Sequence, residues 1–352
     1  MDLIKKGYGF LLVALSFFLL TLMSCGGGVK PPEDTTPKPY TCSGTPATCL
    51  RIASGWTFEG VVLSQGQTGN GGADPWIVRL DDGRYRLYYA VAIDEPTAWW
   101  GMVSWISSDG LRFTQESGYR LEGYTLFQHC IVRNSDGSYR MYWLDQKQGF
   151  VNNLGNKAIK SALSTDGGWT FSEEVGERLT YSGTAYETNG IVSCRVLLLP
   201  NGSLRMYYHA ISDYDRILSA TSSDGLNFTR EGGVRLDRLC PPETRFGGVT
   251  PVIDAQGAVH VFVQTVRCTG NYVNPQAGLF DGSTPDGLTI NINASPFVQG
   301  YSKDGTVANS VEPEDFTVVQ TPGGLRVYFI LYNAGKVIPE TALYSVINTS
   351  IK

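Results

Sequence analysis

Apolar and polar positions alternate in short blocks along this chain, and the same order of blocks occurs five times. Each copy has an apolar run, a polar turn that contains glycine, and a second apolar run rich in aromatic and β-branched residues. Because Asp-Gly and Asn-Gly turns adopt positive φ readily, this order is typical of a β-hairpin. The copies begin at Trp76, Cys130, Arg195, Pro251 and Phe316, and their turn glycines are Gly83, Gly137, Gly202, Gly257 and Gly323.

A second short element follows each of the first four hairpins. It reads "SSDGLRF" from Ser107, "STDGGWTF" from Ser164, "SSDGLNF" from Ser222 and "TPDGLTI" from Thr284. These segments resemble Asp-boxes, the turns between the third and fourth strands of a propeller blade. An acidic side chain in such a turn caps backbone N–H groups, so we interpret the regularly spaced Asp109, Asp166 and Asp224 as structural residues.

Each repeat therefore has room for four short strands, which is the architecture of a propeller blade. The last repeat ends after "TALYSVINTS" from Thr341 and lacks a fourth strand, whereas "SGWTFEGVVL" from Ser54 is similar to the missing piece. An N-terminal strand that completes the last blade would leave no open sheet edge. The repeats predict an all-β, five-bladed propeller over residues 49–352. A β-sandwich and a six-bladed ring with one degenerate repeat remain alternatives.

The N-terminus has the pattern of a targeting signal. Lys5 and Lys6 precede an apolar run from Phe10 to Met23, which is short for a membrane span and is followed by Ser24 and Cys25. This resembles the bacterial lipobox, which implies that residues 1–24 are a signal peptide and that Cys25 carries a lipid. A plain signal peptide and an N-terminal anchor are alternatives. Residues 25–48 are rich in glycine and proline, which predicts a flexible tether that holds the protein at the bacterial cell envelope (outer membrane, periplasm or cell surface).

Charge and cysteine content narrow the possible partners. The formal net charge is −5 and becomes −6 without residues 1–24, so nucleic acid is not an expected partner, because phosphate binding needs a basic surface. With Cys25 taken by lipid, six cysteines remain, which predicts disulfides in an oxidising compartment. The candidate pairs are Cys42–Cys49, Cys130–Cys194 and Cys240–Cys268, with buried free thiols as the alternative. No CxxC pair, metal-ligand spacing or cofactor motif occurs, so neither metal nor cofactor is predicted.

Candidate chemistry lies in the segments that lead into the innermost strands, because these segments line the central cavity of a propeller. Several carboxylates converging on one cavity suit glycoside hydrolysis, in which one carboxylic acid protonates the leaving oxygen and another carboxylate activates water or attacks. Alignment on the turn glycines places Asp74 in blade one, Gln128 and His129 in blade two, Glu187 in blade three, Arg245 in blade four, and Glu314 and Asp315 in blade five.

The stretch "ADPWIVRLDDGRYRLYY" from Ala73 resembles the first blade of the five-bladed-propeller glycosidases, the arabinanase/xylosidase and invertase/levansucrase clans. In those families an Asp before the first inner strand is the general base or nucleophile, and a Glu that opens blade three is the general acid. The resemblance implies these roles for Asp74 and Glu187, with Glu314 as a candidate third carboxylate. The families carry a further Asp in blade two, where this chain has Gln128-His129.

The remaining candidates would contact substrate. Trp100 could stack on a sugar ring, and Gln128, His129, Arg245 and Asp315 could bind sugar hydroxyls or charged groups. Trp100 and His129 have structural alternatives, because blade aromatics belong mostly to the core and buried histidines are often structural. Asp74 has one too, because an Asp before proline often shapes a turn.

The sequence thus predicts an oligo- or polysaccharide as substrate or ligand. A non-catalytic propeller that binds glycan or protein is the alternative, and Gln128-His129 favours it. A sialidase is disfavoured, because the chain has no Arg-Ile-Pro signature.

Overall fold

The computed structural model describes residues 49–64, 67, 73–94, 99–124, 126–146, 157–184, 186–213, 215–237, 245–266, 278–302, 310–333 and 342–352. All of these belong to the unit Thr41–Lys352, one of two units into which the chain divides, the other being Met1–Tyr40. Cys25 and the predicted tether lie outside the described residues. In the described part of the chain no helix is long and apolar enough to cross a membrane.

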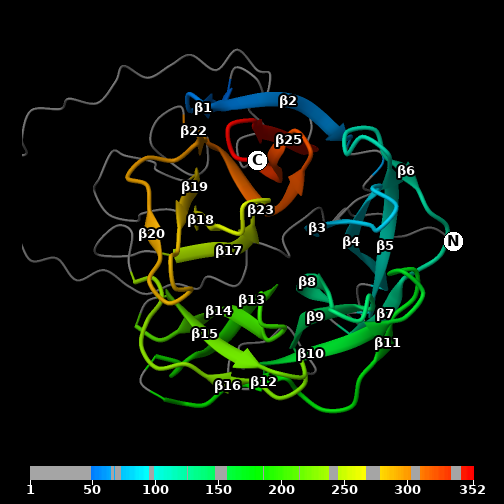
Figure 1. Ribbon diagram of the computed structural model, residues 1–352, viewed down its shortest axis with the longest axis vertical. Helices are drawn as coiled ribbons and strands as arrows, with labels where there is room; N and C mark the ends of the chain where they lie inside the picture. The colour runs from blue at the N-terminus through cyan, green and yellow to red at the C-terminus, as the bar shows by residue number, and fades with distance from the viewer. Residues whose placement is uncertain are drawn as a thin grey trace, which may run out of the picture. The chain divides into compact units, whose positions relative to one another are not determined.

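Five antiparallel sheets are arranged around a ring, with one strand of each sheet at the centre (Figure 1). The predicted five-bladed propeller is therefore confirmed, and the sandwich and the six-bladed ring are excluded. Blade one consists of β3 (Ala73–Arg79), β4 (Tyr85–Asp94), β5 (Trp99–Ser107), β6 (Thr114–Gln115) and β7 (Leu121–Tyr124). Blade two consists of β8 (Phe127–Arg133), β9 (Tyr139–Gln146), β10 (Lys157–Ser164), β11 (Ser172–Glu173) and β12 (Leu179–Thr180).

The other three blades repeat this order from the centre outwards. Blade three consists of β13 (Gly190–Leu198), β14 (Leu204–Ile211), β15 (Asp215–Ser222) and β16 (Thr229–Arg230). Blade four consists of β17 (Arg245–Ile253), β18 (Val259–Val266), β19 (Gly278–Ser283), β20 (Asn291–Ile292), β21 (Val298–Gln299) and β1 (Arg51–Ile52). Blade five consists of β22 (Tyr301–Ser302), β23 (Ser310–Thr321), β24 (Gly324–Asn333), β25 (Leu343–Asn348) and β2 (Trp56–Leu63).

Blade five is built from both ends of the sequence. Strand β2 pairs antiparallel with β25, from Trp56 opposite Asn348 to Leu63 opposite Leu343. The predicted N-terminal closing strand is thus confirmed. Strand β1 adds a pairing that was not predicted, because it joins β21 at the outer edge of blade four. The N-terminal segment therefore contributes strands to the two blades that meet where the ring closes.

The core lies between the faces of neighbouring blades. Side chains alternate along β4, so that Leu87 and Tyr89 pack in a cluster with Leu343 of blade five, while Tyr88 packs in the cluster shared with blades two and three. Both faces of each blade are therefore apolar. This explains why the strands read as nearly continuous runs of aromatic and β-branched residues rather than as a strict alternation of apolar and polar positions.

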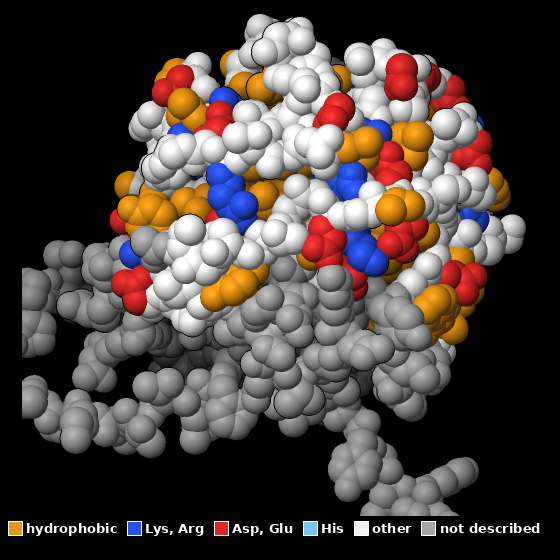
Figure 2. Space-filling model, turned by 90° about the horizontal axis from the view of Figure 1, so that it is seen from below, with side chains coloured by type: hydrophobic (Ala, Val, Ile, Leu, Met, Phe, Trp, Pro, Cys, Tyr) orange, Lys and Arg blue, Asp and Glu red, His pale blue; other side chains and the backbone are white. Residues whose placement is uncertain are grey.

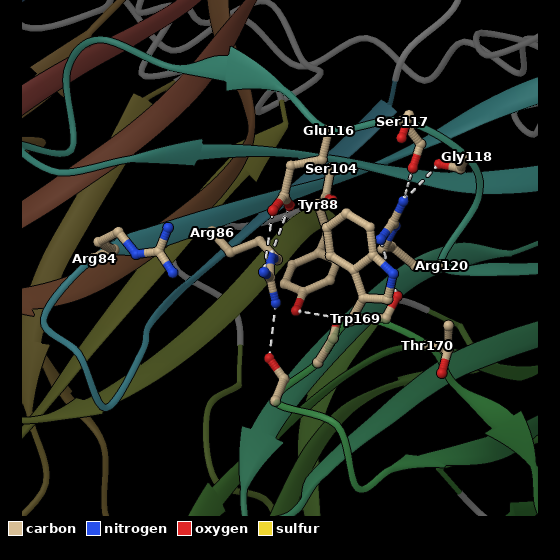
Figure 3. A network of polar contacts seen from close by, with 12 residues as sticks. Arg84, Arg86, Tyr88, Ser104, Glu116, Ser117, Gly118, Arg120, Trp169 and Thr170 are labelled. Atoms are coloured by element: carbon tan, nitrogen blue, oxygen red, sulfur yellow. Dashed lines mark hydrogen bonds and ion pairs between the residues drawn. The ribbon is translucent and has the colours of Figure 1, made fainter.

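One polar arrangement, which we call the arginine clamp, joins a blade to its neighbour (Figure 3). In blade one Arg86 donates to the Glu116 carboxylate at 2.8 Å and to the Gly167 carbonyl of blade two at 2.7 Å, and Tyr88 Oη donates to the Gly168 carbonyl at 2.9 Å. Ser104 Oγ donates to the same Glu116 carboxylate. Equivalent clamps contain Arg140, Arg205 and Arg326, which bind Glu174, Glu231 and Glu59 respectively.

The turns that receive the clamps are held by their own aspartates. Asp109 Oδ1 accepts from the backbone N–H groups of Leu111 and Arg112 at 2.9 and 2.8 Å. Asp166 and Asp224 cap their turns in the same way, at Trp169 and Thr170 and at Leu226 and Asn227. Backbone donors hold the pKa values of Asp109 and Asp224 below the ordinary range. These carboxylates are committed to the turns, although the resemblance of the segments to Asp-boxes stays a prediction.

Blade four has no clamp among its described residues, because His260 stands where the other blades have arginine, and it contacts Asp254 at 2.8 Å instead. Blade five, the next blade around the ring, has no turn between its third and fourth strands, because β25 and β2 come from opposite parts of the sequence. Aromatic packing fills this seam: Trp56 stacks on Phe297 at 4.2 Å between ring centroids, and Phe262 meets both rings edge-on. The arginine is thus missing at the interface that offers no turn carbonyl to bind.

Charges on the visible surface are mixed. Figure 2 shows, on the face seen from below, acidic and basic side chains lying next to one another with scattered hydrophobic side chains between them. Among the described residues visible on that face, no large patch of a single sign is seen.

Candidate active site

All five innermost strands carry a β-bulge near the end at which they begin. The register shifts at residues 73–76 of β3, 127–130 of β8, 192–194 of β13, 246–248 of β17 and 314–316 of β23. The four non-glycine residues with positive φ in the described part of the chain are at these bulges: Asp74, Gln128, Ser193 and Asp315 (φ 55°, 49°, 52° and 33°). Such backbone strain costs about 1–3 kcal/mol per residue and is concentrated at functional sites.

Each acidic bulge residue binds the backbone of the next bulge around the ring. Asp315 accepts a hydrogen bond from the backbone N–H of Asp74. Asp74 in turn accepts from the backbone N–H of Gln128, at 2.8 Å from its Oδ2 atom. Asp74 is 6 % exposed and Asp315 is half-buried. The bulges thus place two carboxyl groups, one from blade five and one from blade one, at the same level of the ring. We call Asp74 and Asp315 the acid pair.

Burial and mutual repulsion disfavour ionisation of the acid pair. Burial, followed by the negative charge of Asp74, raises the pKa of Asp315 to about 7. Burial also raises the pKa of Asp74, although the Gln128 N–H and the charge of Arg195 oppose the rise. Because the two groups interact, they titrate as a pair. Because the negative charge of Asp74 contributes to this rise, Asp315 is the member of the pair that retains a proton toward neutral pH, as a general acid must.

Two further side chains of this centre were not predicted from the sequence. Tyr89 of β4 is fully buried, and after burial the charges of Asp315 and Asp74 are the next causes that raise its pKa. Arg195 of β13 is 4 % exposed, and its Nη1 donates to the carbonyls of Gln128, His129 and Cys194 at 3.0, 3.3 and 2.9 Å. The available signal was a charged residue that opens the apolar run "RVLLL" of a central strand.

Glu187 has a different environment from the acid pair. It precedes β13, and its fully buried carboxylate forms an ion pair with Arg230 at 2.8 Å. Tyr208 Oη and Ser182 Oγ also donate to it, at 2.7 and 2.6 Å. Although burial alone would raise the pKa of Glu187, the bonds from Arg230, Ser182 and Tyr208 lower it. The general-acid role implied by the resemblance stays a prediction, and in this geometry Glu187 is an ionised group that lacks the proton an acid must donate.

The bulges also correct the alignment between blades. The position equivalent to Asp74 is Ser193 in blade three and Asp315 in blade five, whereas the turn glycines had placed Glu314 in the blade-five position. Glu187, the predicted acid of blade three, lies before this bulge. Glu314 is the half-buried residue immediately before the blade-five bulge. Among the residues predicted to contact substrate, Arg245 is the one whose side chain lies outside the described part of the structure. Its backbone belongs to β17.

The blade-two and aromatic candidates lie within the packing of the blades. His129 is fully buried, and burial followed by the charge of Arg195 lowers its pKa to about 3, so it is neutral near pH 7. Gln128 is half-buried, and its Oε1 atom is buried without a hydrogen-bond partner. Trp100 is half-buried and meets Phe127 edge-on at 4.5 Å. The predicted sugar-binding roles of all three stay predictions.

The cysteines require one correction. Cys130 and Cys194 are buried free thiols, so the predicted Cys130–Cys194 disulfide is wrong. The repeat positions do bring them together, because β8 and β13 are neighbouring inner strands, but the two side chains meet as a hydrogen-bonded thiol pair. Cys42, Cys240 and Cys268 lie outside the described residues, and the pairings that include them stay predictions.

Other sites are few. The described residues contain no cluster of three or more His, Cys, Asp or Glu side chains that could hold a metal ion. A hollow of about 420 Å³ lies at the outer strands of blade one, lined by Val103, Gln115 and Tyr119 among others, and neither member of the acid pair lines it.

No protein-family model and no curated protein matches the sequence. Solved structures do match the fold. A glycoside hydrolase aligns with a TM-score of 0.59 and 11% identity over 82% of this chain and 90% of that one. A thermostable family-43 glycoside hydrolase aligns at 0.51 and 14%, over 79% and 88%. An N-acetylgalactosamine deacetylase from F. plautii, in complex with blood group B trisaccharide, aligns at 0.52 and 13%, over 84% and 95%. The chain therefore has a glycoside hydrolase-like propeller fold.

Proposed function

We propose that this protein hydrolyses a glycosidic bond in an oligo- or polysaccharide and that the acid pair performs the reaction. The observation that carries the proposal is the coupled state of two buried carboxyl groups on strained bulges of adjacent inner strands, with the pKa of Asp315 raised to about 7. The resemblance of the first blade to the propeller glycosidases and the likeness of the fold support glycan as the substrate class.

In the proposed reaction Asp315 is the acid and Asp74 is the carboxylate. Asp315 donates its proton to the glycosidic oxygen as the bond from that oxygen to the anomeric carbon breaks. Water supplies the new oxygen on the anomeric carbon, either directly with Asp74 as general base or after Asp74 has formed a covalent intermediate. Asp74 takes the proton from water in the direct case, and Asp315 takes it when the intermediate is hydrolysed. Both routes return the pair to one proton.

The test is hydrolysis of a panel of 4-nitrophenyl glycosides and plant and fungal polysaccharides by wild type, Asp74→Asn and Asp315→Asn. We expect each substitution to lower kcat by roughly 10²–10⁴-fold, because each removes acid–base catalysis. Circular dichroism and the Tm confirm that the variants are folded. Hydrolysis that persists undiminished in both variants contradicts the proposal.

A second candidate is a glycan-binding propeller without turnover. Three features favour it: Gln128 occupies the bulge where blade one has Asp74, Asp74 Oδ2 is bonded to a backbone N–H, and Glu187 is bound to Arg230. A glycan array followed by product analysis separates the candidates. Tight binding of a glycan that remains intact after long incubation supports the binder, whereas released reducing ends support the hydrolase.

We further propose that the protein is held at the cell envelope by a lipid on Cys25. The lipobox-like segment that ends at Ser24 and Cys25 supports this. Incorporation of a labelled fatty acid in bacteria tests it: wild type should take up label and Cys25→Ala should not. Equal labelling of the two proteins contradicts the anchor.

A further inference from the structure

The buried centre of the ring contains few groups that carry charge near neutral pH. Burial raises the pKa of Tyr89 well above its ordinary value, and burial lowers the pKa values of His129 and His209 to about 3. The tyrosine and both histidines are therefore uncharged at pH 7. The ionisable groups that remain near the acid pair on the described inner strands are Arg195, the thiols of Cys130 and Cys194, and two further carboxyls of β23, Glu312 and Glu314.

Arg195 is fixed to the strand segment that binds Asp74. Its Nη1 bonds the carbonyls of Gln128 and His129 in the blade-two bulge, and the N–H of Gln128 in the same bulge donates to Asp74. The guanidinium also lies 5.2 Å from the centre of the Trp76 ring, two residues after Asp74. Arg195 is therefore connected to Asp74 in two ways. Its hydrogen bonds hold the blade-two bulge that orients Asp74, and its guanidinium packs on Trp76 of the strand that carries Asp74.

The single positive charge of Arg195 can balance one negative charge on the acid pair, but not two. With one carboxyl ionised, the pair and Arg195 together are neutral, whereas ionisation of both would leave a net negative charge in a medium of low polarity. The charge of Arg195 acts on both carboxyls and lowers the pKa of each against the effect of burial. Without the cation, the pKa of each carboxyl would therefore rise further.

We infer that Arg195 is the positioning residue of the acid pair: its charge keeps one carboxyl ionised, and its bonds to the blade-two bulge hold the N–H that orients Asp74. Arg195 acts through these groups. The charge part of the inference concerns protonation alone, while its consequence for rate rests on the proposed function.

The experiment measures the protonation of Asp315 directly. The protein is labelled with ¹³C at the aspartate carboxyl carbons, the Asp315 signal is assigned by its loss in Asp315→Asn, and its chemical shift is followed against pH by NMR. In wild type the midpoint should be near 7. In Arg195→Gln, which keeps side-chain donors and removes the charge, it should rise by about one pH unit or more. In Arg195→Lys, which keeps the charge, it should stay close to the wild-type value.

Two matched variants keep the result specific. Arg235 is also a buried arginine that bonds backbone carbonyls, but of Gly232, Gly233 and Leu288, so Arg235→Gln should destabilise the protein without moving the Asp315 midpoint. Cys130→Ser removes the coupled thiol next to Arg195 and should also leave the midpoint in place. An unchanged midpoint in Arg195→Gln overturns the inference, as does an equal rise in Arg235→Gln or Cys130→Ser.

Kinetics supply a separate readout. If the protein hydrolyses a 4-nitrophenyl glycoside, the alkaline limb of its pH–rate profile should shift to higher pH in Arg195→Gln, together with the NMR midpoint of Asp315. In Arg195→Lys the alkaline limb should lie at the wild-type pH. If wild type hydrolyses no substrate, the proposed function fails, while the NMR titration still decides whether Arg195 controls the protonation of the pair.

Discussion

Two groups of buried carboxyls in this ring have opposite surroundings. At the outer strands Glu116, Glu174, Glu231 and Glu59 each bind an arginine through two oxygens and a serine hydroxyl. At the inner strands Asp74 and Asp315 have backbone N–H donors and form no ion pair within the described part of the chain. A paired carboxylate is a fixed structural charge, whereas an unpaired buried carboxyl keeps a proton that it can transfer. The presence or absence of an arginine partner therefore distinguishes structural carboxylates from candidate catalytic ones better than their spacing in the sequence does.

The largest effect should come from breaking an outer clamp. Arg326 binds Glu59 of the closing strand and the Asp109 carbonyl of blade one, so Arg326→Met leaves a buried carboxylate without its partner. We expect a loss of about 3–5 kcal/mol in the free energy of unfolding, measured by urea denaturation. Removal of both partners, Arg326→Met with Glu59→Gln, should recover part of the loss. A change of less than about 1 kcal/mol in the single variant would show that the clamp is not a structural element.

An inner acid should behave in the opposite way. The folded-state pKa of Asp315 lies above the unfolded value, so its ionisation opposes folding, and the penalty grows as pH rises from about 4 to about 7. Asp315→Asn should remove this slope and make the protein more stable than wild type at pH 8, by roughly 2–4 kcal/mol before screening. Urea denaturation at pH 5 and pH 8 measures it. A variant that is less stable than wild type at pH 8 would contradict the assignment.

A capped turn should give the smallest effect. Asp224 Oδ1 binds two backbone N–H groups, and Asp224→Ala leaves them to solvent, at a cost of about 0.5–2 kcal/mol by analogy with helix caps. Because the pKa of Asp224 is lowered in the folded state, its contribution is present at neutral pH and is lost as pH falls below the ordinary range of an aspartate. Urea denaturation at pH 7 and pH 3 should therefore show a difference between wild type and variant that shrinks at pH 3.

The fold could be predicted because its signals are repeated and local. Five hairpins and the incomplete last repeat were enough for the blade count and for the closing strand β2. The absence of the clamp from blade four also has a signal in the sequence. The second strands of blades one, two, three and five contain Arg-x-Tyr, whereas that of blade four has His260-Val261-Phe262.

The site was harder to predict, because it depends on bulges and on partners from other blades. Alignment on turn glycines placed Glu314 opposite Asp74, but the turn of blade five is one residue shorter, since Gln320 pairs with Leu325 where blade one pairs Arg79 with Tyr85. The equivalent position is therefore Asp315. Glu187 had the residue type of a general acid, and the bond to Arg230, 43 positions later, determines its state. Arg195 was hidden in an apolar run. None of these relations has a local signature in the sequence.

The central claim is that the acid pair of the inner strands holds a proton near neutral pH. Titration of the Asp315 carboxyl by ¹³C NMR in the wild-type protein tests it most directly. We predict a midpoint near pH 7 for Asp315. The difference between the wild-type and Asp74→Asn spectra should show a second transition, which belongs to Asp74. A single transition near pH 4, as in an exposed aspartate, would show that the acid pair is ionised at neutral pH and would contradict its role as a proton donor.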